Sequence, residues 1–352
     1  MQLRAYNKPL IITKKYNLRV CSVALESIVF FVASLLMLVI SSELLVVFAT
    51  RIAKEFRAGH FFIGFMLVSL TTSFPELGIA LVSSLEGNAA ISAANLVGAS
   101  IADVTWVLGI TAIAGTVIIH QKRFLQSTRK VLLLSIIPAA VFFRGILDGM
   151  AAVVLGVVIA LFFIEVTNTM KSKPKHHPIE PIAPTAGFLI GEKLRLEEKK
   201  PGDHRRWRIM FGFVLSAALL IASAFVVINA TKTIALEFNI RETAIGITLL
   251  ALATTLPETI VNLTAIRRKK VELALGDLFG SSIINLGMGG LIIAVLHPQN
   301  LNVMPLQSAV ATLAAITIFY WIVSKKLKTV PKAAGVLLVV AYFIFLFYQI
   351  TA

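Results

Sequence analysis

The sequence predicts an all-α polytopic membrane protein with ten transmembrane helices, arranged as two inverted repeats of five helices. The composition is the first reason, because 57% of residues are hydrophobic and only 14% are charged, which is far more apolar than a soluble domain. Second, the apolar residues form long blocks, and several reach the roughly 20 residues that a membrane span needs. Third, a segment of the first half recurs in the second half, 182 residues later.

The hydropathy pattern and its breakers divide the chain into ten predicted spans. They lie near residues 25–49, 61–84, 90–118, 131–146, 150–168, 209–230, 243–266, 272–296, 305–324 and 333–350. The predicted organisation is an N-terminal tail (1–24), a first repeat (25–170), a hinge loop (171–208) and a second repeat (209–352). The block at 90–118 is longer than one span requires, which predicts a tilted or bent helix.

The hinge loop differs in composition from both halves. It contains four prolines within residues 174–184 and a charged run at 197–200, which predict a solvated segment with at most a short amphipathic helix. His176, His177 and His204 lack a cysteine partner and lack helical i, i+4 spacing, so they favour a solvated loop over a metal site. The only cysteine, Cys21, cannot form an internal disulfide.

The net charge of +15 follows the topology of the predicted loops. Loops on one side carry most of the Lys and Arg: Arg51, Lys54, Arg57, Lys122, Arg123, Arg129, Lys130, Arg267–Lys270, Lys325, Lys326, Lys328 and Lys332. Loops on the other side carry only Arg144, Lys232 and Arg241, so the rich side and the hinge should be cytoplasmic, with both termini outside the cell membrane. The basic N-terminal tail argues against this orientation. Without a basic face of interleaved aromatics, the charge predicts contact with anionic headgroups rather than nucleic acid.

The internal repeat aligns without a gap. The five residues 72–76 (TSFPE) match residues 254–258 (TTLPE), and further identities flank this unit. Each repeat has an odd number of predicted spans, so the second enters the membrane with opposite polarity. Inverted repeats of this kind are typical of secondary transporters, whose ions bind near the midplane where the repeats meet.

A proline interrupts the second span, and its equivalent interrupts the seventh. Pro75 and Pro257 lack a backbone N–H, so each frees a carbonyl one turn earlier and predicts a broken helix. Inside a membrane a freed carbonyl needs a partner, and a cation can be that partner.

The residue after each proline is a glutamate. Glu76 and Glu258 lie deep in their spans, where an ionisable group costs several kcal/mol without a partner. One such unit alone is equally well explained by a kinked helix with a snorkelling glutamate. Its recurrence, away from either end of the span, favours an ion-binding site.

The next span of each repeat adds Asn95 and, at the equivalent position, Asp277. Small residues around them, such as Gly98 and Gly280, let helices approach closely. The predicted ligands are therefore Glu76, Glu258, Asp277, Asn95, Thr72, Ser73, Thr254 and Thr255. This all-oxygen set suits a hard cation, and calcium fits best. Asp103, equivalent to Asn285, has two open interpretations: a proton or ion relay, or a cap or hydrogen bond to a neighbouring helix near the membrane surface.

These motifs resemble the α-repeats of sodium/calcium exchangers in the cation/calcium antiporter superfamily, over residues of about 61–110 and 243–292. The resemblance implies an antiporter without a cofactor, rather than an enzyme, that exchanges calcium for sodium by alternating access. It implies that Glu76 and Glu258 are central calcium ligands, that Asn95 and Asp277 add ligands, and that the hydroxyls serve both ions. It also implies that the first and sixth helices slide against a rigid core.

The sequence departs from the family pattern at several positions. Thr71 and Ala253 replace the usual glycine, and Ile91 and Leu273 replace a common hydroxyl. Asp103 replaces the usual asparagine. The missing hydroxyls weaken the case for binding the full number of sodium ions, and the added carboxylate favours protons as the counter-ion. Proton/calcium exchange is therefore the alternative function.

A more remote alternative is an intramembrane aspartyl protease. Residues 274–277 (ALGD) faintly resemble the Gly-x-Gly-Asp motif of such proteases, and Asp103 would be the second aspartate. The two Pro-Glu units argue against this alternative, because they have no role in a reaction that needs two aspartates sharing a proton.

Overall fold

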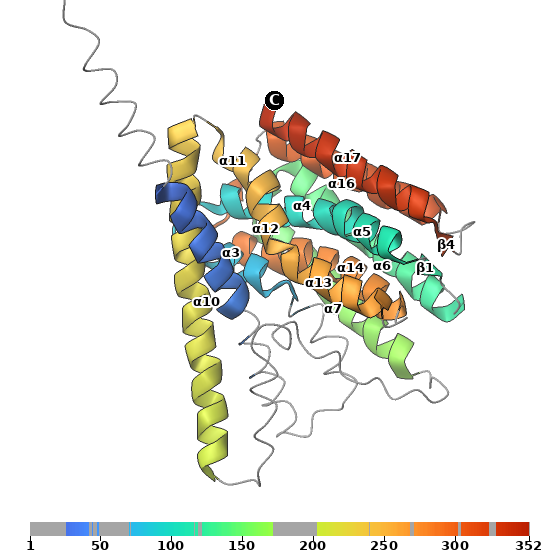
Figure 1. The fold of residues 1–352 in the computed structure, drawn as a ribbon, viewed down its shortest axis with the longest axis horizontal. Helices are drawn as coiled ribbons and strands as arrows, with labels where there is room; N and C mark the ends of the chain where they lie inside the picture. The colour runs from blue at the N-terminus through green and yellow to red at the C-terminus, as the bar shows by residue number, and fades with distance from the viewer. Residues whose placement is uncertain are drawn as a thin grey trace, which may run out of the picture.

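A computed structural model shows a helical bundle (Figure 1). It describes residues 26–41, 44, 48, 70, 72–115, 117–118, 122–171, 203–238, 240–267, 271–301, 304–323 and 329–351. The predicted N-terminal tail, most of the predicted hinge (with His176 and His177) and much of the second span, including Thr71, lie outside these residues.

The first repeat begins with the helix Glu26–Ser41, drawn in blue in Figure 1. It continues with α3 (Phe74–Leu85), α4 (Ala89–Ala102), η1 (Asp103–Val107), α5 (Leu108–Ala114), α6 (Lys122–Arg144) and α7 (Gly149–Lys171). The elements α4, η1 and α5 form one continuous helical run, in which η1 is a π-helical segment.

The second repeat begins with the long helix α10 (Asp203–Phe238), which runs along one side of the bundle (Figure 1). It continues with α11 (Glu242–Ile245), η2 (Gly246–Leu250), α12 (Ala251–Thr254), α13 (Leu256–Arg267), α14 (Val271–Ile283), η3 (Ile284–Gly289), α15 (Gly290–Leu296), α16 (Met304–Val323) and α17 (Lys332–Thr351). Thr255 separates α12 from α13, and the chain bends there by 41°.

The two repeats agree element by element at the offset found in the sequence. Helices α3 and α13 are both 12 residues long and begin at equivalent positions. The π-helical segments η1 and η3 also overlap at equivalent positions, from Asp103 and Asn285 onward. The sequence repeat is therefore a repeat of structure.

Four two-residue strands join the repeats to each other. Strand β1 (Val117–Ile118) pairs with β4 (Thr329–Val330), and β2 (Ile146–Leu147) pairs with β3 (Gln299–Asn300). In each antiparallel pair, one strand comes from each repeat. The all-α prediction omits these strands, because two residues are too few to show an alternating pattern.

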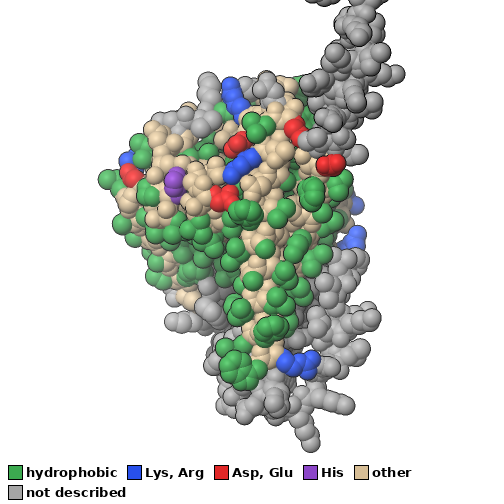
Figure 2. Space-filling model, turned by 90° about the vertical axis from the view of Figure 1, so that its left-hand side faces the viewer, with side chains coloured by type: hydrophobic (Ala, Val, Ile, Leu, Met, Phe, Trp, Pro, Cys, Tyr) green, Lys and Arg blue, Asp and Glu red, His purple; other side chains and the backbone are tan. Residues whose placement is uncertain are grey.

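The central runs are mostly buried, whereas α10 and α17 expose most of their surface. The described residues form two buried hydrophobic clusters: a larger one centred on α4, α6, α7, α14 and α16, and a smaller one between the helix Glu26–Ser41, α3 and α10. Hydrophobic side chains also cover much of the outer face, and most of the charged side chains visible there lie in its upper part (Figure 2). An apolar outer surface of this extent is expected of a protein surrounded by lipid.

Among the described residues, four helical runs are long and apolar enough to cross a membrane. They are Ala89–Ala114, Trp207–Phe238, Ala274–Leu296 and Lys332–Thr351, with a fifth if the bent α11–α13 segment counts as one span. The predicted total of ten spans therefore stays a prediction.

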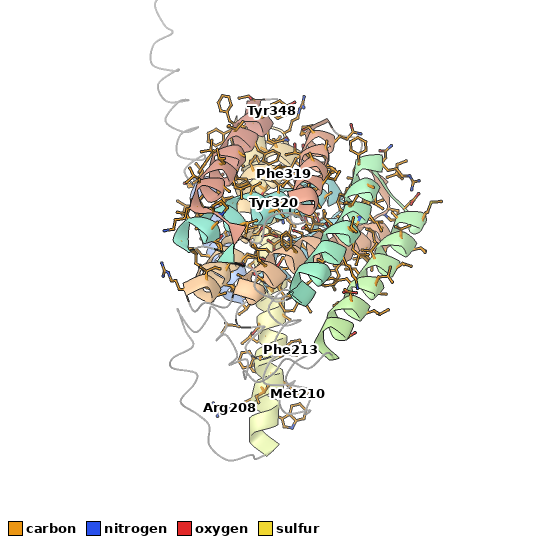
Figure 3. The ribbon with its side chains drawn as sticks, turned by 90° about the vertical axis from the view of Figure 1, so that its right-hand side faces the viewer. Arg208, Met210, Phe213, Phe319, Tyr320 and Tyr348 are labelled. Carbon is orange, nitrogen blue, oxygen red and sulfur yellow. The ribbon has the colours of Figure 1, made fainter. Side chains whose placement is uncertain are left out.

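Three predicted boundaries are wrong. Helix α6 begins at Lys122 rather than near 131, so basic residues expected in a loop are helical. Helix α10 begins at Asp203, inside the predicted hinge, and ends at Phe238 rather than near 230. Arg208, Met210 and Phe213 lie on the part of α10 that projects beyond the bundle (Figure 3). The apolar signal marks only the lipid-facing part of a helix, so polar or basic extensions are missed.

Candidate functional site

The two Pro-Glu units begin two equivalent helices. Helix α3 begins directly after Ser73, and α13 begins directly after Thr255. In each helix the proline is the second residue, where its missing N–H costs no intrahelical hydrogen bond. Glu76 and Glu258 lie in the first turns, where the helix dipole favours a carboxylate. Although the sequence places both glutamates far from the ends of their spans, each is thus near the start of a helix.

Two hydrogen bonds connect the repeats at these helix starts. The Thr72 hydroxyl donates to Oδ1 of Asp277 over 3.3 Å. The Thr254 hydroxyl has two acceptors within reach, Oδ1 of Asn95 at 3.4 Å and the Ala251 carbonyl of its own helix at 3.2 Å. Thr72 is equivalent to Thr254, and Asn95 is equivalent to Asp277, so the same contact occurs twice. In both cases the hydroxyl belongs to one repeat and the acceptor to the other, so the site requires both repeats.

The two glutamates are buried, and among the described residues their carboxylates have no hydrogen-bond partner. Their exposed fractions are 0% for Glu76 and 1% for Glu258, and none of their four carboxylate oxygens accepts a hydrogen bond within the described part of the chain. The Thr254 hydroxyl is close enough to stabilise a charged Glu76, although the geometry is not that of a hydrogen bond. Glu258 is within electrostatic range of Glu76, Asp103 and Asp277, so four acidic side chains share one buried region. Because unpaired buried carboxylates are costly, this region needs cations or protons.

The other two predicted hydroxyl ligands flank the helix starts. Ser73 is fully buried, and its Oγ has no hydrogen-bond partner among the described residues. The Thr255 hydroxyl donates to the Leu252 carbonyl over 3.1 Å. A hydroxyl oxygen that donates still has lone pairs to offer a cation.

Asp103 belongs to the same buried region. It lies at the start of η1, is 0% exposed, and neither of its carboxylate oxygens accepts a hydrogen bond from the described residues. This environment does not support the interpretation of Asp103 as a cap near the membrane surface. The equivalent residue, Asn285, is also buried with both polar side-chain atoms unpaired. π-Helical segments often lie at functional sites, and both repeats have one here.

Two glycines allow α4, which carries Asn95, to lie close to η2 and α12, which lead to Thr254. A Cβ atom on Gly98 would lie 2.7 Å from Cβ of Ala251 and would also collide with the Ile247 carbonyl oxygen. On the facing segment, a Cβ atom on Gly246 would lie 2.9 Å from Cβ of Ala94. Only glycine allows α4 to approach η2 and α12 this closely, as expected of small residues between membrane helices.

The sequence interpretation missed two polar residues of the site. Nδ2 of Asn262 donates to Oδ2 of Asp277 over 2.7 Å and to the Glu258 carbonyl over 2.8 Å. The hydroxyl oxygens of Ser281 and Thr72 lie 3.4 Å apart. The equivalents of Asn262 and Ser281 in the first repeat are alanines, so a search for repeated polar residues passes over both. The sequence feature that could have identified Asn262 is its position as a polar residue one turn after Glu258 in an otherwise apolar helix.

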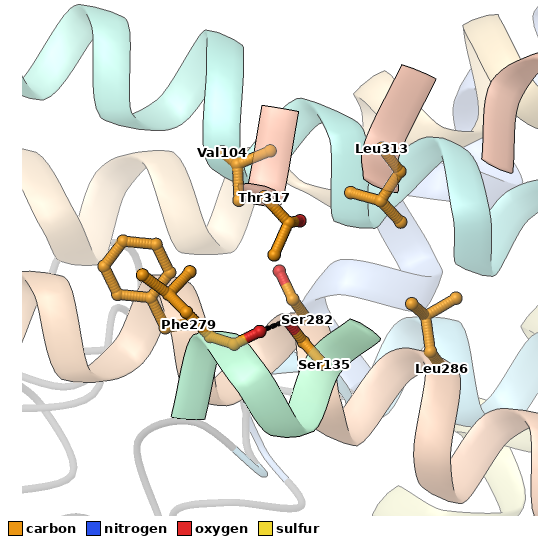
Figure 4. Close-up of a pocket in the computed structure, with 8 residues that line it drawn as sticks. Val104, Ser135, Phe279, Ser282, Leu286, Leu313 and Thr317 are labelled. Atoms are coloured by element: carbon orange, nitrogen blue, oxygen red, sulfur yellow. Dashed lines mark hydrogen bonds between the residues drawn. The ribbon is translucent and has the colours of Figure 1, made fainter. Parts of the chain in front are cut away.

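A separate small cavity lies between α6, η1, α14, η3 and α16 (Figure 4). Its hydroxyl-bearing residues are Ser135, Ser282 and Thr317, and it has room for about one water molecule. Ser135 and Thr317 are equivalent residues of the two repeats. None of the predicted ligands lines this cavity.

The described residues contain no group of three or more His, Cys, Asp or Glu side chains close enough together to hold a metal ion. The predicted ligand set is of a different kind, because it combines carboxylates with hydroxyl and amide oxygens.

Comparison with known proteins identifies the family. The family model described as "Sodium/calcium exchanger protein" matches residues 26–171 and 208–351, which cover both repeats. The chain belongs to the sodium/calcium exchanger family. Since this is a family of exchangers and not of enzymes, the family assignment agrees with the transporter prediction and does not support the protease alternative.

Individual relatives align over nearly their full length. An uncharacterised membrane protein of Methanocaldococcus jannaschii is 29% identical, over 90% of this chain and 95% of that protein. The sodium/calcium exchanger MaX1 of Methanosarcina acetivorans is 26% identical, over 89% and 95%. Solved structures of the sodium-calcium exchanger NCX_Mj share the fold, one with a TM-score of 0.58 and 24% identity over 91% of this chain and 98% of that chain.

Proposed function

We propose that this exchanger moves calcium in one direction across the membrane against sodium in the other, by alternating access. The observation that carries the proposal is the pair of unpartnered buried glutamates, Glu76 and Glu258, at equivalent helix starts. The relative MaX1 is named a sodium/calcium exchanger, which supports the choice of ions.

The chemistry of the site suits alternate occupancy by a divalent and by monovalent ions. Calcium prefers six to eight oxygen ligands in a flexible arrangement. Glu76 and Glu258 would supply two negative charges that match one calcium ion, and Thr72, Ser73, Thr254 and Thr255 would supply neutral oxygens. When calcium leaves, sodium ions on the same oxygens would neutralise the carboxylates.

The proposed architecture has ten spans, with the second and seventh broken before α3 and α13. The helix Glu26–Ser41 and α10 would move against the core, and they pack against each other on the outside of the bundle. In this arrangement the hinge lies in the cytoplasm and both termini lie outside the cell membrane, as the basic loops predict.

Exchange of calcium for protons is a second candidate, favoured by Asp103. This carboxylate is buried, unpaired and within electrostatic range of Glu76 and Asp277, where a relay would be useful. If the exchange is coupled to protons, Asp103 of the first repeat would pass protons to the two glutamates.

Transport by purified protein in lipid vesicles tests the proposal. Vesicles loaded with sodium and diluted into sodium-free medium should take up calcium-45, and vesicles without sodium but with an outward proton gradient should not. Uptake driven by the proton gradient alone would show that protons, and not sodium, are the counter-ion. If neither gradient drives uptake, the protein is not a calcium exchanger of either kind.

A further inference from the structure

We propose that Asn262 is a positioning residue for ion binding, which holds Asp277 in the orientation that the transported cation needs. This inference rests on the proposed function, since it assigns Asn262 a part in the same site. None of the family motifs described above includes this position.

Geometry is the first support. Asn262 lies on α13 one turn after Glu258, is fully buried, and bridges two helices by donating to the Glu258 carbonyl and to Oδ2 of Asp277 on α14. A backbone carbonyl can only accept, so the amide nitrogen has to face these two neighbours and the orientation of the side chain is defined.

Both oxygens of Asp277 are therefore engaged, one by Asn262 and the other by Thr72. Glu76 and Glu258 differ, since none of their oxygens accepts a hydrogen bond in the described region. The Asp277 side chain is thus held in one orientation, whereas the oxygens of the two glutamates stay available to an ion.

The difference between the repeats is the second support. Where the second repeat has Asp277, Asn262 and Ser281, the first has Asn95, Ala80 and Ala99. The extra carboxylate thus occurs together with two extra polar residues that contact it or its partner Thr72. Packing alone does not require an amide at position 262, because alanine serves at the equivalent position 80.

The amide oxygen of Asn262 differs from its amide nitrogen in its hydrogen bonding. Its Oδ1 is buried without a hydrogen bond among the described residues. A buried amide oxygen normally has a partner, so its absence here fits an oxygen that meets the cation or its water when the site is loaded.

The consequence for transport concerns affinity more than turnover. Without Asn262, Asp277 would have to be ordered by each arriving ion, and the ordering cost would weaken binding. Hydrogen bonds to charged groups contribute enough for a loss of about tenfold or more in affinity. The half-saturating calcium concentration should rise by this factor, while maximal uptake should change by less than about threefold.

A double-mutant cycle in sodium-loaded vesicles tests the role. Asn262→Ala should raise the half-saturating calcium concentration about tenfold in the natural sequence. The rise should be less than about twofold in an Asp277→Ala background, which lacks the acceptor, because the action of Asn262 passes through Asp277. Asn229→Ala is the matched control, since half-buried Asn229 makes the same type of amide-to-carbonyl bond on α10, but this bond is exposed. It should leave half-saturating calcium unchanged.

Equal effects of Asn262→Ala in both backgrounds, or no effect in the natural sequence, would overturn the inference. The same cycle measured by thermal unfolding without calcium reports the contact itself, and Asn262→Ser replaces the alanine variant if that variant does not fold. Absence of exchange in the unmutated protein would instead refute the proposed function, and the unfolding cycle would then still decide whether Asn262 holds Asp277.

Discussion

The hydroxyl oxygens of Ser41 and Ser223 lie 3.4 Å apart, and these two serines occupy equivalent positions in the two repeats. A residue that contacts its own equivalent lies beside the axis that relates the repeats. The axis therefore passes between the helix Glu26–Ser41 and α10. The contact of Ser27 with Glu237, farther along both helices, shows that they run antiparallel.

If these two helices move together, joining them should not stop transport. Ser41→Cys with Ser223→Cys, in a chain whose Cys21 is replaced by serine, should form a disulfide after mild oxidation because the two side-chain oxygens are so close. The cross-linked protein should keep at least about half of its calcium uptake in vesicles. The single-cysteine variants, oxidised in parallel, are the controls, and loss of uptake that reduction restores would show that the helices move separately.

The two threonines of the crossing hydrogen bonds should differ in effect. Thr72 donates to a carboxylate and Thr254 to an amide oxygen, and bonds to charged groups are about twice as strong. Thr72→Val should raise half-saturating calcium about tenfold, and Thr254→Val about threefold. Calcium titration of uptake measures both. Equal effects would mean that the threonines act mainly as cation ligands.

The close approach of α4 to η2 makes Gly98 sensitive to any side chain. Gly98→Ala should lower the free energy of unfolding by about 1–3 kcal/mol, because the added methyl group collides with backbone. Gly156→Ala on α7 is the matched control, since no atom lies within 4 Å of the added Cβ. The thermal unfolding temperature in detergent should fall for Gly98→Ala only. A fall of the same size for both variants would contradict the packing argument.

The sequence was sufficient for the main organisation of the molecule. The unit TSFPE and its repeat TTLPE predicted a break in each of two equivalent helices, and the structure has equivalent helix starts at Phe74 and Leu256. Proline and a buried carboxylate are both costly in an apolar helix, so their recurrence carries information. The equivalence of Asn95 with Asp277 likewise led to two residues that the structure places in equivalent contacts.

The sequence was insufficient where a contact depends on a polar residue whose equivalent in the other repeat is not polar. Asn262 and Ser281 have alanine at their equivalent positions, so the repeat gave no reason to select them. The sequence also could not show that Thr72 contacts Asp277 rather than Asn95 of its own repeat. That exchange between repeats depends on how α3, α4, α13 and α14 pack, which is a tertiary property.

One ion pair breaks the symmetry between the two repeats. Nζ of Lys232 on α10 lies 3.2 Å from Oε2 of Glu86, at the end of α3. The residues at the equivalent positions are Thr50 and Arg268, which cannot form such a pair because neither side chain is acidic. If α10 slides during transport, the contact of Lys232 with Glu86 breaks, so it stabilises one state by up to about 1 kcal/mol.

Removal of that ion pair should shift the balance of states. Lys232→Met should change the half-saturating calcium concentration by about two- to fivefold on one side of the membrane only, measured with vesicles of defined orientation. High salt should reduce the difference between this variant and the natural protein, because both side chains are partly exposed. Equal changes on both sides would show that the pair does not distinguish the states.

The central claim is that Glu76 and Glu258 together hold the transported calcium, and calcium-45 uptake by glutamine variants tests it most directly. Glu76→Gln and Glu258→Gln keep the size of the side chain but remove its charge, and each should reduce sodium-driven uptake in vesicles by at least about a hundredfold. Size-exclusion chromatography and thermal unfolding would establish that both variants are folded. Uptake near the natural rate in either folded variant would contradict the account.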